Sequence, residues 1–221
     1  KTTTKELINA VLSKQYNVQA TIGNLNNHIG VPLTLLSMTK DTEIGIVEMG
    51  ANHQKEIEFL CTIALPDFGY ITNFGKAHLE GFGGIEGVIK GKSEMYFHLF
   101  DNNKIIFVNA DDPLQIEKTK SARTIKFGSE VDQPSYNIKF LTAEPFVSVS
   151  FKNKVFNSNL IGTYNFSNIS SAIAIGSYFK VSDEKIKSAI EDYIPENNRS
   201  QIITKGKTKV ILDAYNANPT S

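Results

Sequence analysis

The chain has 221 residues, of which 23 are basic and 23 are acidic, so its formal net charge at pH 7 is zero. This balance excludes a whole-molecule field that would hold the protein on nucleic acid or on an anionic membrane. Domains usually have roughly 100–200 residues, so this length allows one large domain or two small ones.

Cysteine content and hydropathy indicate the cellular setting. Cys61 is the single cysteine, which excludes an intramolecular disulfide and is typical of a reducing cytosol. The longest apolar runs, such as residues 105–108, are far shorter than the roughly 20 residues that span a bilayer, and no leader peptide opens the sequence. We therefore expect a soluble, cytoplasmic protein without a membrane span.

The first half of the chain alternates between helical and extended patterns. The first dozen residues carry apolar side chains on one helical face, with threonines in the first turn. Apolar runs rich in β-formers follow, with helical patterns between them, and this alternation predicts a mainly parallel sheet flanked by helices. These runs cover residues 18–22, 44–49, 68–72 and 105–108.

The pattern changes in the second half. Between residues 123 and 161 the apolar runs are shorter and alternate with polar residues, which predicts a small antiparallel β annex. Helical patterns return at residues 168–179 and 183–193, and Pro195 ends the second helix because proline cannot continue the hydrogen-bond ladder. The predicted fold class is therefore α/β.

A polar stretch at residues 196–198 has the character of a linker, and residues 209–212 have the pattern of the first strand of another domain. We therefore place a domain border near residue 196. In this prediction residues 1–195 form a central domain, and residues 196–221 form the linker and the start of a second, Rossmann-like domain.

Lys1 and Thr2 stand at a predicted helix start, an arrangement similar to the tail of a P-loop. In that motif the lysine reaches the terminal phosphates of a nucleotide and the next hydroxyl ligates Mg²⁺. The glycines of the motif are absent, so we expect a strand and a Gly-rich loop to precede Lys1 in the parent protein. A capped helix with a solvated lysine is the structural alternative.

Polar residues also stand at the ends of two predicted strands. Glu48 closes one apolar run, and Asn73 closes the next, with His78 a few residues on. The carboxyl ends of parallel strands face the crevice where α/β sheets bind ligands. Glu48 could hold Mg²⁺ opposite the phosphates, and His78 could be a neutral metal ligand, unless both simply face water.

Four segments, in the right order along the chain, resemble the Mur ligases: residues 23–34, 48–53, 71–83 and 213–219. The sequence His-Leu-Glu-Gly-Phe-Gly at residues 78–83 is particularly similar to that of the family members that add D-alanyl-D-alanine to a UDP-linked muramoyl tripeptide. The resemblance implies a P-loop-type central sheet and an ATP-dependent, ADP-forming amide ligase of cell-wall synthesis.

The resemblance also implies roles for single residues. Lys1 and Arg199 would contact the phosphates of ATP, and Thr2, Glu48 and His78 would bind Mg²⁺. Such phosphoryl chemistry depends on charge neutralisation and in-line positioning more than on a protein nucleophile. We therefore expect no Ser/His/Asp triad and no catalytic cysteine.

Lys92 matches the lysine that Mur ligases carry as a carbamate. A neutral lysine amine that captures CO₂ becomes an anion, which can ligate a second Mg²⁺ where the ammonium would repel it. From its spacing alone, Lys92 would be an exposed helix residue.

Asn165 and Asn168 match the two family asparagines that face adenine, although Tyr164 stands where histidine is usual. Amides suit the adenine edge because they both donate and accept hydrogen bonds, but both asparagines could also be plain helix caps. Asp213 would accept from the ribose hydroxyls. The implied ATP-binding set is Lys1, Thr2, Thr3, Asn73, Asn165, Asn168, Arg199 and Asp213.

Asn26 and Asn27 lie in the loop where family members contact the muramoyl substrate. The expected partners are small molecules, namely ATP, Mg²⁺, the UDP-muramoyl tripeptide and D-alanyl-D-alanine, bound by a monomer. Two alternatives stay open. The chain could belong to a related ligase with another acceptor, such as the enzyme that adds the third residue or a folylpolyglutamate synthase, or it could be a non-catalytic nucleotide-binding module.

Overall fold

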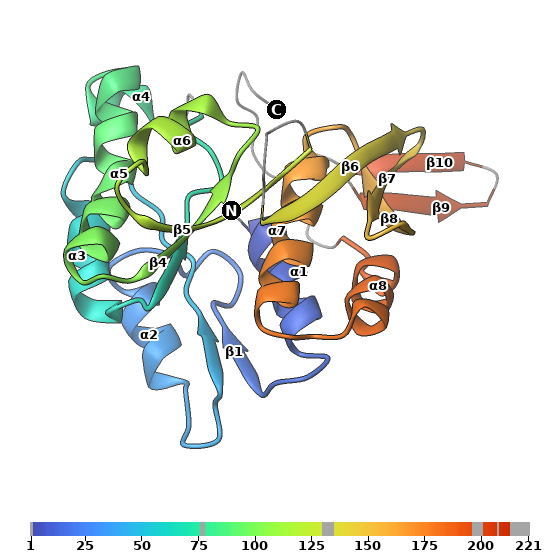
Figure 1. Ribbon diagram of the computed structural model, residues 1–221, viewed down its shortest axis with the longest axis horizontal. Coiled ribbons are helices and arrows are strands. Elements are labelled where there is room, and N and C mark those ends of the chain that lie inside the picture. The colour runs from blue at the N-terminus through green and yellow to red at the C-terminus, as the bar shows by residue number, and fades with distance from the viewer. Residues whose placement is uncertain (1, 76–77, 130–134, 196–200, 207, 213–221) are drawn as a thin grey trace.

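The structure is a computed structural model that describes residues 2–75, 78–129, 135–195, 201–206 and 208–212 (Figure 1). The helices are α1 (Thr2–Leu12), α2 (Gly30–Leu36), α3 (Glu56–Ala64), α4 (Leu79–Phe82), α5 (Ile85–Asp101), α6 (Pro113–Lys118), α7 (Asn165–Tyr178) and α8 (Asp183–Asp192). The strands are β1 (Val18–Ala20), β2 (Ile44–Ile46), β3 (Phe68–Tyr70), β4 (Ile105–Asn109), β5 (Arg123–Gly128), β6 (Tyr136–Ala143), β7 (Phe146–Phe151), β8 (Lys154–Ile161), β9 (Gln201–Lys205) and β10 (Thr208–Leu212).

Six strands form one mixed sheet in the order β3-β4-β5-β6-β7-β8. The strands from β3 to β6 pair in parallel, and β6, β7 and β8 pair antiparallel. Strands β1 and β2 form a separate parallel pair, and β9 and β10 an antiparallel one. The predicted α/β fold with a parallel sheet and an antiparallel part is confirmed.

The antiparallel part differs from the prediction in two ways. β5 was expected in the annex, yet it pairs in parallel with β4, because α6 provides a crossover between them. β6 pairs with both β5 and β7, so the annex continues the main sheet. Alternating polarity marks a strand with one solvated face, whereas strand direction depends on the connection, which the pattern does not record.

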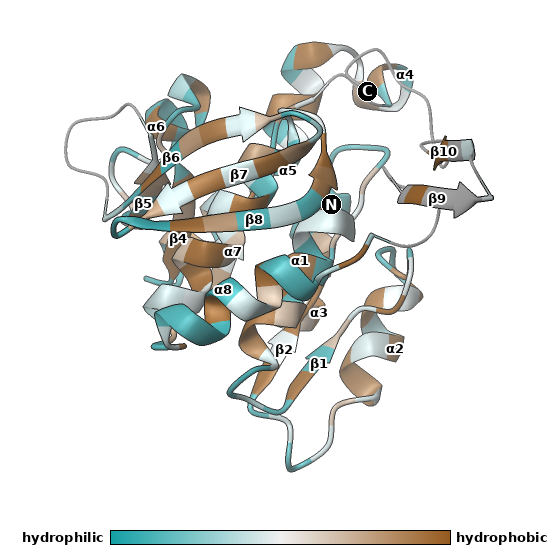
Figure 2. Ribbon diagram, turned by 90° about the vertical axis from the view of Figure 1, so that its right-hand side faces the viewer, coloured by the Kyte–Doolittle hydropathy of each residue, from teal (hydrophilic) through white to brown (hydrophobic). Residues whose placement is uncertain are grey.

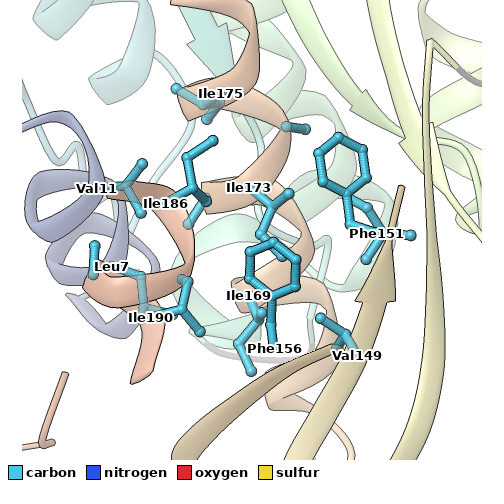
Figure 3. Close-up of a cluster of buried hydrophobic side chains, with 14 of the residues drawn as sticks. Leu7, Val11, Val149, Phe151, Phe156, Ile169, Ile173, Ile175, Ile186 and Ile190 are labelled. Carbon is cyan, nitrogen blue, oxygen red and sulfur yellow. The ribbon is translucent and has the colours of Figure 1, made fainter. Parts of the chain in front are cut away.

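Helix α7 forms the centre of the larger hydrophobic core. It packs against α1 and α8 on one side and against strands β4 to β7 on the other. Figure 3 shows its side chains between those of the two helices and those of β7 and β8. The labelled residues are Leu7, Val11, Val149, Phe151, Phe156, Ile169, Ile173, Ile175, Ile186 and Ile190, each at most 6% exposed.

Strand β4 is buried on both faces. Phe107 packs into the core around α7, whereas Ile106 and Val108 pack into a second core under α5. Successive side chains of a strand point to opposite faces, so burial on both sides explains the continuous apolar run. Helix α8 covers the outside of the larger core, and Figure 2 shows hydrophilic residues along its outer side.

Some predicted boundaries moved. α7 begins at Asn165, so Asn165 and Asn168 lie within its first turn, although the helix was predicted from residue 168. The hairpin of β9 and β10 contains one strand that the sequence pattern did not indicate. The proposed domain border near residue 196 falls on residues outside those described and stays a prediction. Among the described residues, no helix has the length and apolarity needed to cross a bilayer.

Candidate active site

The N-terminus of α1 meets the end of β2 at Glu48. Thr2 Oγ1 donates to Glu48 Oε1 at 3.4 Å, and Asn26 Nδ2 donates to the same oxygen at 3.2 Å. Glu48 Oε2 is buried and has no hydrogen-bond partner. A buried carboxylate oxygen without a partner costs free energy, whereas Mg²⁺ prefers carboxylate and other oxygen ligands. Thr2 and Glu48 therefore fit the metal-binding pair that the sequence predicts.

The N-terminus of α1 also meets that of α7. Thr4 Oγ1 donates to Asn168 Oδ1 at 2.7 Å, and Asn168 Nδ2 donates to Asn165 Oδ1 at 2.8 Å. Asn165 is 1% exposed, and its Nδ2 donates to Ile161 O at 2.8 Å. These bonds join the two predicted adenine-facing asparagines to the helix that carries Thr2. Thr4 was not predicted, because its partner lies 164 residues away in the sequence.

Lys92 and Asn73 meet in the loop that follows β3. Lys92 is half-buried on α5, and its Nζ donates to the Asn73 carbonyl at 2.9 Å. Asn73 Oδ1 accepts from the Gly75 N–H at 3.0 Å, which holds the loop after the strand. The Asn73 carbonyl, in the loop after β3, thus contacts the lysine that was predicted to carry a carbamate.

His78 is exposed and precedes α4 with a φ of 59°, in the left-handed region. This conformation is uncommon for residues other than glycine, although histidine adopts it more readily than most. The helix that follows packs on the loop after Glu48: Gln54 Nε2 donates to Phe82 O at 3.3 Å. A Cβ at Gly81 would lie 2.2 Å from Asn52 O, so only glycine allows this approach.

A Cβ at Gly91, next to Lys92, would lie 2.5 Å from Phe82 Cε1 and 3.6 Å from Gln54 Cα, so the segments that carry Glu48, His78 and Lys92 are neighbours. Convergence of the three side chains on one metal stays a prediction. In the described part of the chain, no three His, Cys, Asp or Glu side chains gather into a metal site. The predicted ligand set contains only two residues of these types, since its other members are Thr2 and a modified Lys92.

Glu94 supports this region, although the sequence analysis did not select it. Its side chain is buried on α5 and accepts from the Lys55 N–H at 2.6 Å and from the Glu58 N–H at 3.0 Å. These N–H groups belong to the start of α3, where Lys55 in the N-cap position offers no side-chain cap. The absence of a capping residue before α3 was the available signal. Glu94 fixes α5, and with it Lys92, against α3.

The buried thiol near this site is not a nucleophile. Burial raises the pKa of Cys61 to about 12, and the Glu94 carboxylate adds to the rise. Only the thiolate is reactive, so the thiol stays protonated and unreactive near neutral pH. That the chemistry uses no catalytic cysteine stays a prediction.

The remaining predicted site residues are partly buried, exposed, or outside the described part of the chain. Thr3 is half-buried on α1. Asn27 is exposed, and its Oδ1 accepts from the N–H groups of Ile29 and Gly30 at 3.0 and 2.9 Å, so this oxygen caps the start of α2. Lys1, Arg199 and Asp213 lie outside the described residues, and their nucleotide contacts stay predictions.

A sequence profile of the Mur ligase middle domain matches residues 1–176. The chain belongs to the Mur ligase family. Two curated members are UDP-N-acetylmuramoyl-tripeptide--D-alanyl-D-alanine ligases. That of Bacillus subtilis is 35% identical over 100% of this chain and 49% of its own length. That of Escherichia coli is 32% identical over 99% of this chain and 50% of its own length.

Solved Mur ligase structures have the same fold. A crystal structure of MurF from Acinetobacter baumannii has a TM-score of 0.87 and 32% identity, covering 99% of this chain and 49% of that one. MurF from Thermotoga maritima, solved in complex with ADP, has a TM-score of 0.82 and 29% identity, covering 99% and 52%. The chain thus spans about half the length of these relatives.

Proposed function

We propose that the protein containing this chain is an ATP-dependent ligase that joins D-alanyl-D-alanine to a UDP-N-acetylmuramoyl tripeptide. The observation that carries this proposal is the convergence of Thr2 and Asn26 on Glu48, whose second oxygen is buried without a partner. The similarity to D-alanyl-D-alanine ligases across the whole chain supports the choice of acceptor.

The reaction proceeds in two displacements. A carboxylate oxygen of the tripeptide attacks the γ-phosphorus of ATP, the bond to ADP breaks, and an acyl phosphate forms. The amine of D-alanyl-D-alanine then attacks the acyl carbon and loses a proton, and phosphate leaves. Both steps need charge neutralisation and in-line geometry, which side chains held in place before the reaction provide.

Different residues of this chain bind the metal, the phosphates, the adenine and the muramoyl substrate. Thr2, Glu48 and His78 would hold magnesium, which would neutralise charge on the transferring phosphoryl group. Lys1 and Arg199 contact the phosphates.

Asn165 is 1% exposed and acts by orienting Asn168 toward the adenine, according to the bond between the two amides. Thr3, Asn73 and Asp213 complete the nucleotide contacts, and Asn26 and Asn27 lie on the muramoyl side.

Lys92 contributes an anion in this proposal. The neutral amine adds to CO₂ and releases a proton, which leaves a carbamate with one negative charge. The carbamate nitrogen keeps one N–H, so it retains the donor that bonds the Asn73 carbonyl in this structure. The carboxylate group would then be an anionic ligand for magnesium.

The test is an assay of the full-length protein with ATP, the UDP-muramoyl tripeptide and a panel of amines. We expect phosphate release that depends on D-alanyl-D-alanine. Glu48→Gln should lower kcat on the order of 100-fold or more, because a charged ligand is lost. Glu43→Gln is the matched control, because Glu43 is exposed and lies directly before β2, and it should retain kcat within about twofold.

Each rival function has its own result in this assay. A preference for another amine would assign the protein to a related ligase, and nucleotide binding without turnover would make it a binding module. Gel filtration and fractionation test the further proposal that the ligase is a cytoplasmic monomer.

A further inference from the structure

Thr21 holds the backbone of Glu48 in place. It directly follows β1 and is 1% exposed, and its N–H donates to Ile46 O at 2.9 Å, which extends the pairing of β1 with β2. Its Oγ1 accepts from the Glu48 N–H at 3.0 Å. The last main-chain pair of β1 and β2 is Ala20 with Ile46. Beyond it, the Thr21 side chain takes the place of a main-chain acceptor for the N–H of Glu48, the proposed metal ligand.

Lys5 ties α1 to the same point. Its side chain is only 4% exposed, although lysine is almost never fully buried without a partner. Its Nζ donates to the Thr21 carbonyl and pairs with Glu6 Oε1 at 2.6 Å. A buried ammonium is costly unless it is bonded in this way, so the Thr21 carbonyl determines where Lys5, and therefore α1, can lie.

These contacts close a ring. Thr2 and Lys5 are three residues apart on α1 and so lie on one side of the helix. Lys5 joins that side to Thr21, Thr21 joins the main chain of Glu48, and Glu48 Oε1 returns to Thr2. The ring connects two predicted metal ligands that are 46 residues apart in the sequence. Thr21→Val would remove the bond to the Glu48 N–H, and Lys5→Met would remove the bond to the Thr21 carbonyl, so each change opens the ring at one place.

We infer that Lys5 and Thr21 are positioning residues of the magnesium site. They hold the Thr2 hydroxyl and the Glu48 carboxylate at the separation that the metal requires, without contacting the metal or the substrates themselves. The inference rests on the proposed function, because it takes Thr2 and Glu48 as ligands. Residues that orient metal ligands typically contribute roughly 10–100-fold to metal affinity.

The experiment measures Mn²⁺ binding to the full-length protein in the presence of ADP, by electron paramagnetic resonance of free Mn²⁺. Thr21→Val and Lys5→Met should each weaken Mn²⁺ binding about 10-fold or more. ADP affinity in EDTA should fall less than Mn²⁺ affinity, because Asn73, Asn165 and Asn168 lie outside the ring. Thr21→Ser keeps the hydroxyl and should retain wild-type Mn²⁺ affinity.

The control is Thr119→Val, which removes a buried threonine hydroxyl that donates to Gln115 O at 2.7 Å on α6. It loses a comparable hydrogen bond away from the ring and should bind Mn²⁺ like the wild type. Thermal unfolding is recorded for every variant, and Lys5→Met provides the test if Thr21→Val does not fold.

Three outcomes overturn the inference. Mn²⁺ affinity within about twofold of wild type in folded Thr21→Val or Lys5→Met would refute it and leave the proposed function intact. Equal weakening in Thr119→Val would show a general loss of stability instead of a positioning effect. A wild-type protein that binds no Mn²⁺ with ADP would refute the inference and the proposed metal site together.

Discussion

The charge of Lys92 decides whether this side chain attracts or repels a metal ion at the site. It lies half-buried on α5, and its nitrogen is directed to the Asn73 carbonyl. An ammonium at this position would oppose a metal held by Glu48, whereas a carbamate would attract it. If Lys92 is a carbamate, Lys92→Ala should lower activity, and an added carboxylate should restore part of it. If Lys92 is an ammonium, the same substitution should not weaken metal binding.

Lys92→Ala should lower kcat of the full-length enzyme on the order of 100-fold, because one charged ligand is lost. A short carboxylate such as acetate should restore part of the activity by entering the space that the side chain leaves. Bicarbonate added after CO₂ depletion should stimulate the wild type and leave Lys92→Ala unchanged. Lys90 is exposed on the same helix, and Lys90→Ala is the control. Acetate and bicarbonate should change its activity no more than they change that of the wild type. Full activity in Lys92→Ala would refute the carbamate.

Cys61 makes stability depend on pH. Burial raises its pKa from the ordinary 9.0 to about 12, so the folded state holds this proton more tightly than the unfolded chain does. Its contribution to the free energy of unfolding is therefore complete below pH 9.0 and is lost as the pH rises toward about 12.

Urea unfolding at about pH 8 and about pH 11 measures this loss. The wild type should lose more stability between the two values than Cys61→Ala, in which the thiol is absent. Burial also raises the pKa values of Tyr70 and Tyr96, but these residues remain in both proteins, so the difference isolates Cys61. An identical pH dependence of the two proteins would show that the thiol ionises freely in the fold.

Among the elements, α3 depends on a cap from outside its own sequence. The Lys55 and Glu58 N–H groups at its start bond the Glu94 carboxylate, which comes from α5, 39 and 36 residues away. Helix N-termini leave several N–H groups without partners, and a buried one without a bond costs free energy. Glu94 thus determines how α3 and α5 pack as well as how stable α3 is.

Glu94→Ala should lower the free energy of unfolding by about 1–3 kcal/mol, because it removes the acceptor of two part-buried N–H groups at the start of α3. Glu94→Gln keeps an acceptor oxygen and should cost less. Lys90→Ala is exposed on the same helix and should change stability by about 0.5 kcal/mol or less. Urea denaturation of the three variants measures these values, and equal stabilities of Glu94→Ala and Lys90→Ala would contradict the capping role.

At the scale of the whole molecule, α7 joins the parts that carry the site. It packs on α1, which carries Thr2, and on the six-stranded sheet, while its own first turn carries Asn165 and Asn168. Ile173 is fully buried at the centre of this packing (Figure 3). Loss of packing here should therefore affect stability and nucleotide binding together.

Ile173→Ala should destabilise the protein by about 2–5 kcal/mol, through lost burial and the cavity that remains. Leu36→Ala is the control, because Leu36 is 81% exposed on α2, and its effect should be about 0.5 kcal/mol or less. Chemical denaturation provides both values. A small effect of Ile173→Ala would mean that the core around α7 repacks readily.

The sequence by itself determined the α/β class and the alternation of helices and strands in the first half of the chain, although no pattern indicated β9. Helical and extended periodicities are local, so α1, β4 and α8 could be predicted from neighbouring residues alone. Thr2 and Glu48 could also be predicted, because a hydroxyl at a helix start and a carboxylate at a strand end have a functional meaning in their local context. The family resemblance added Lys92, whose spacing indicated only an exposed helix residue.

Only the tertiary structure decided which side chains meet. The parallel pairing of β5 depends on the path of α6, the cap of α3 comes from Glu94, and Thr4 bonds Asn168 across 164 residues. Lys5 lies on the apolar face of α1, where a lysine is anomalous, but its partner at Thr21 could not be inferred from that helix. These contacts join segments that are distant in sequence, and no local pattern records them, because each depends on how the complete fold places two backbones.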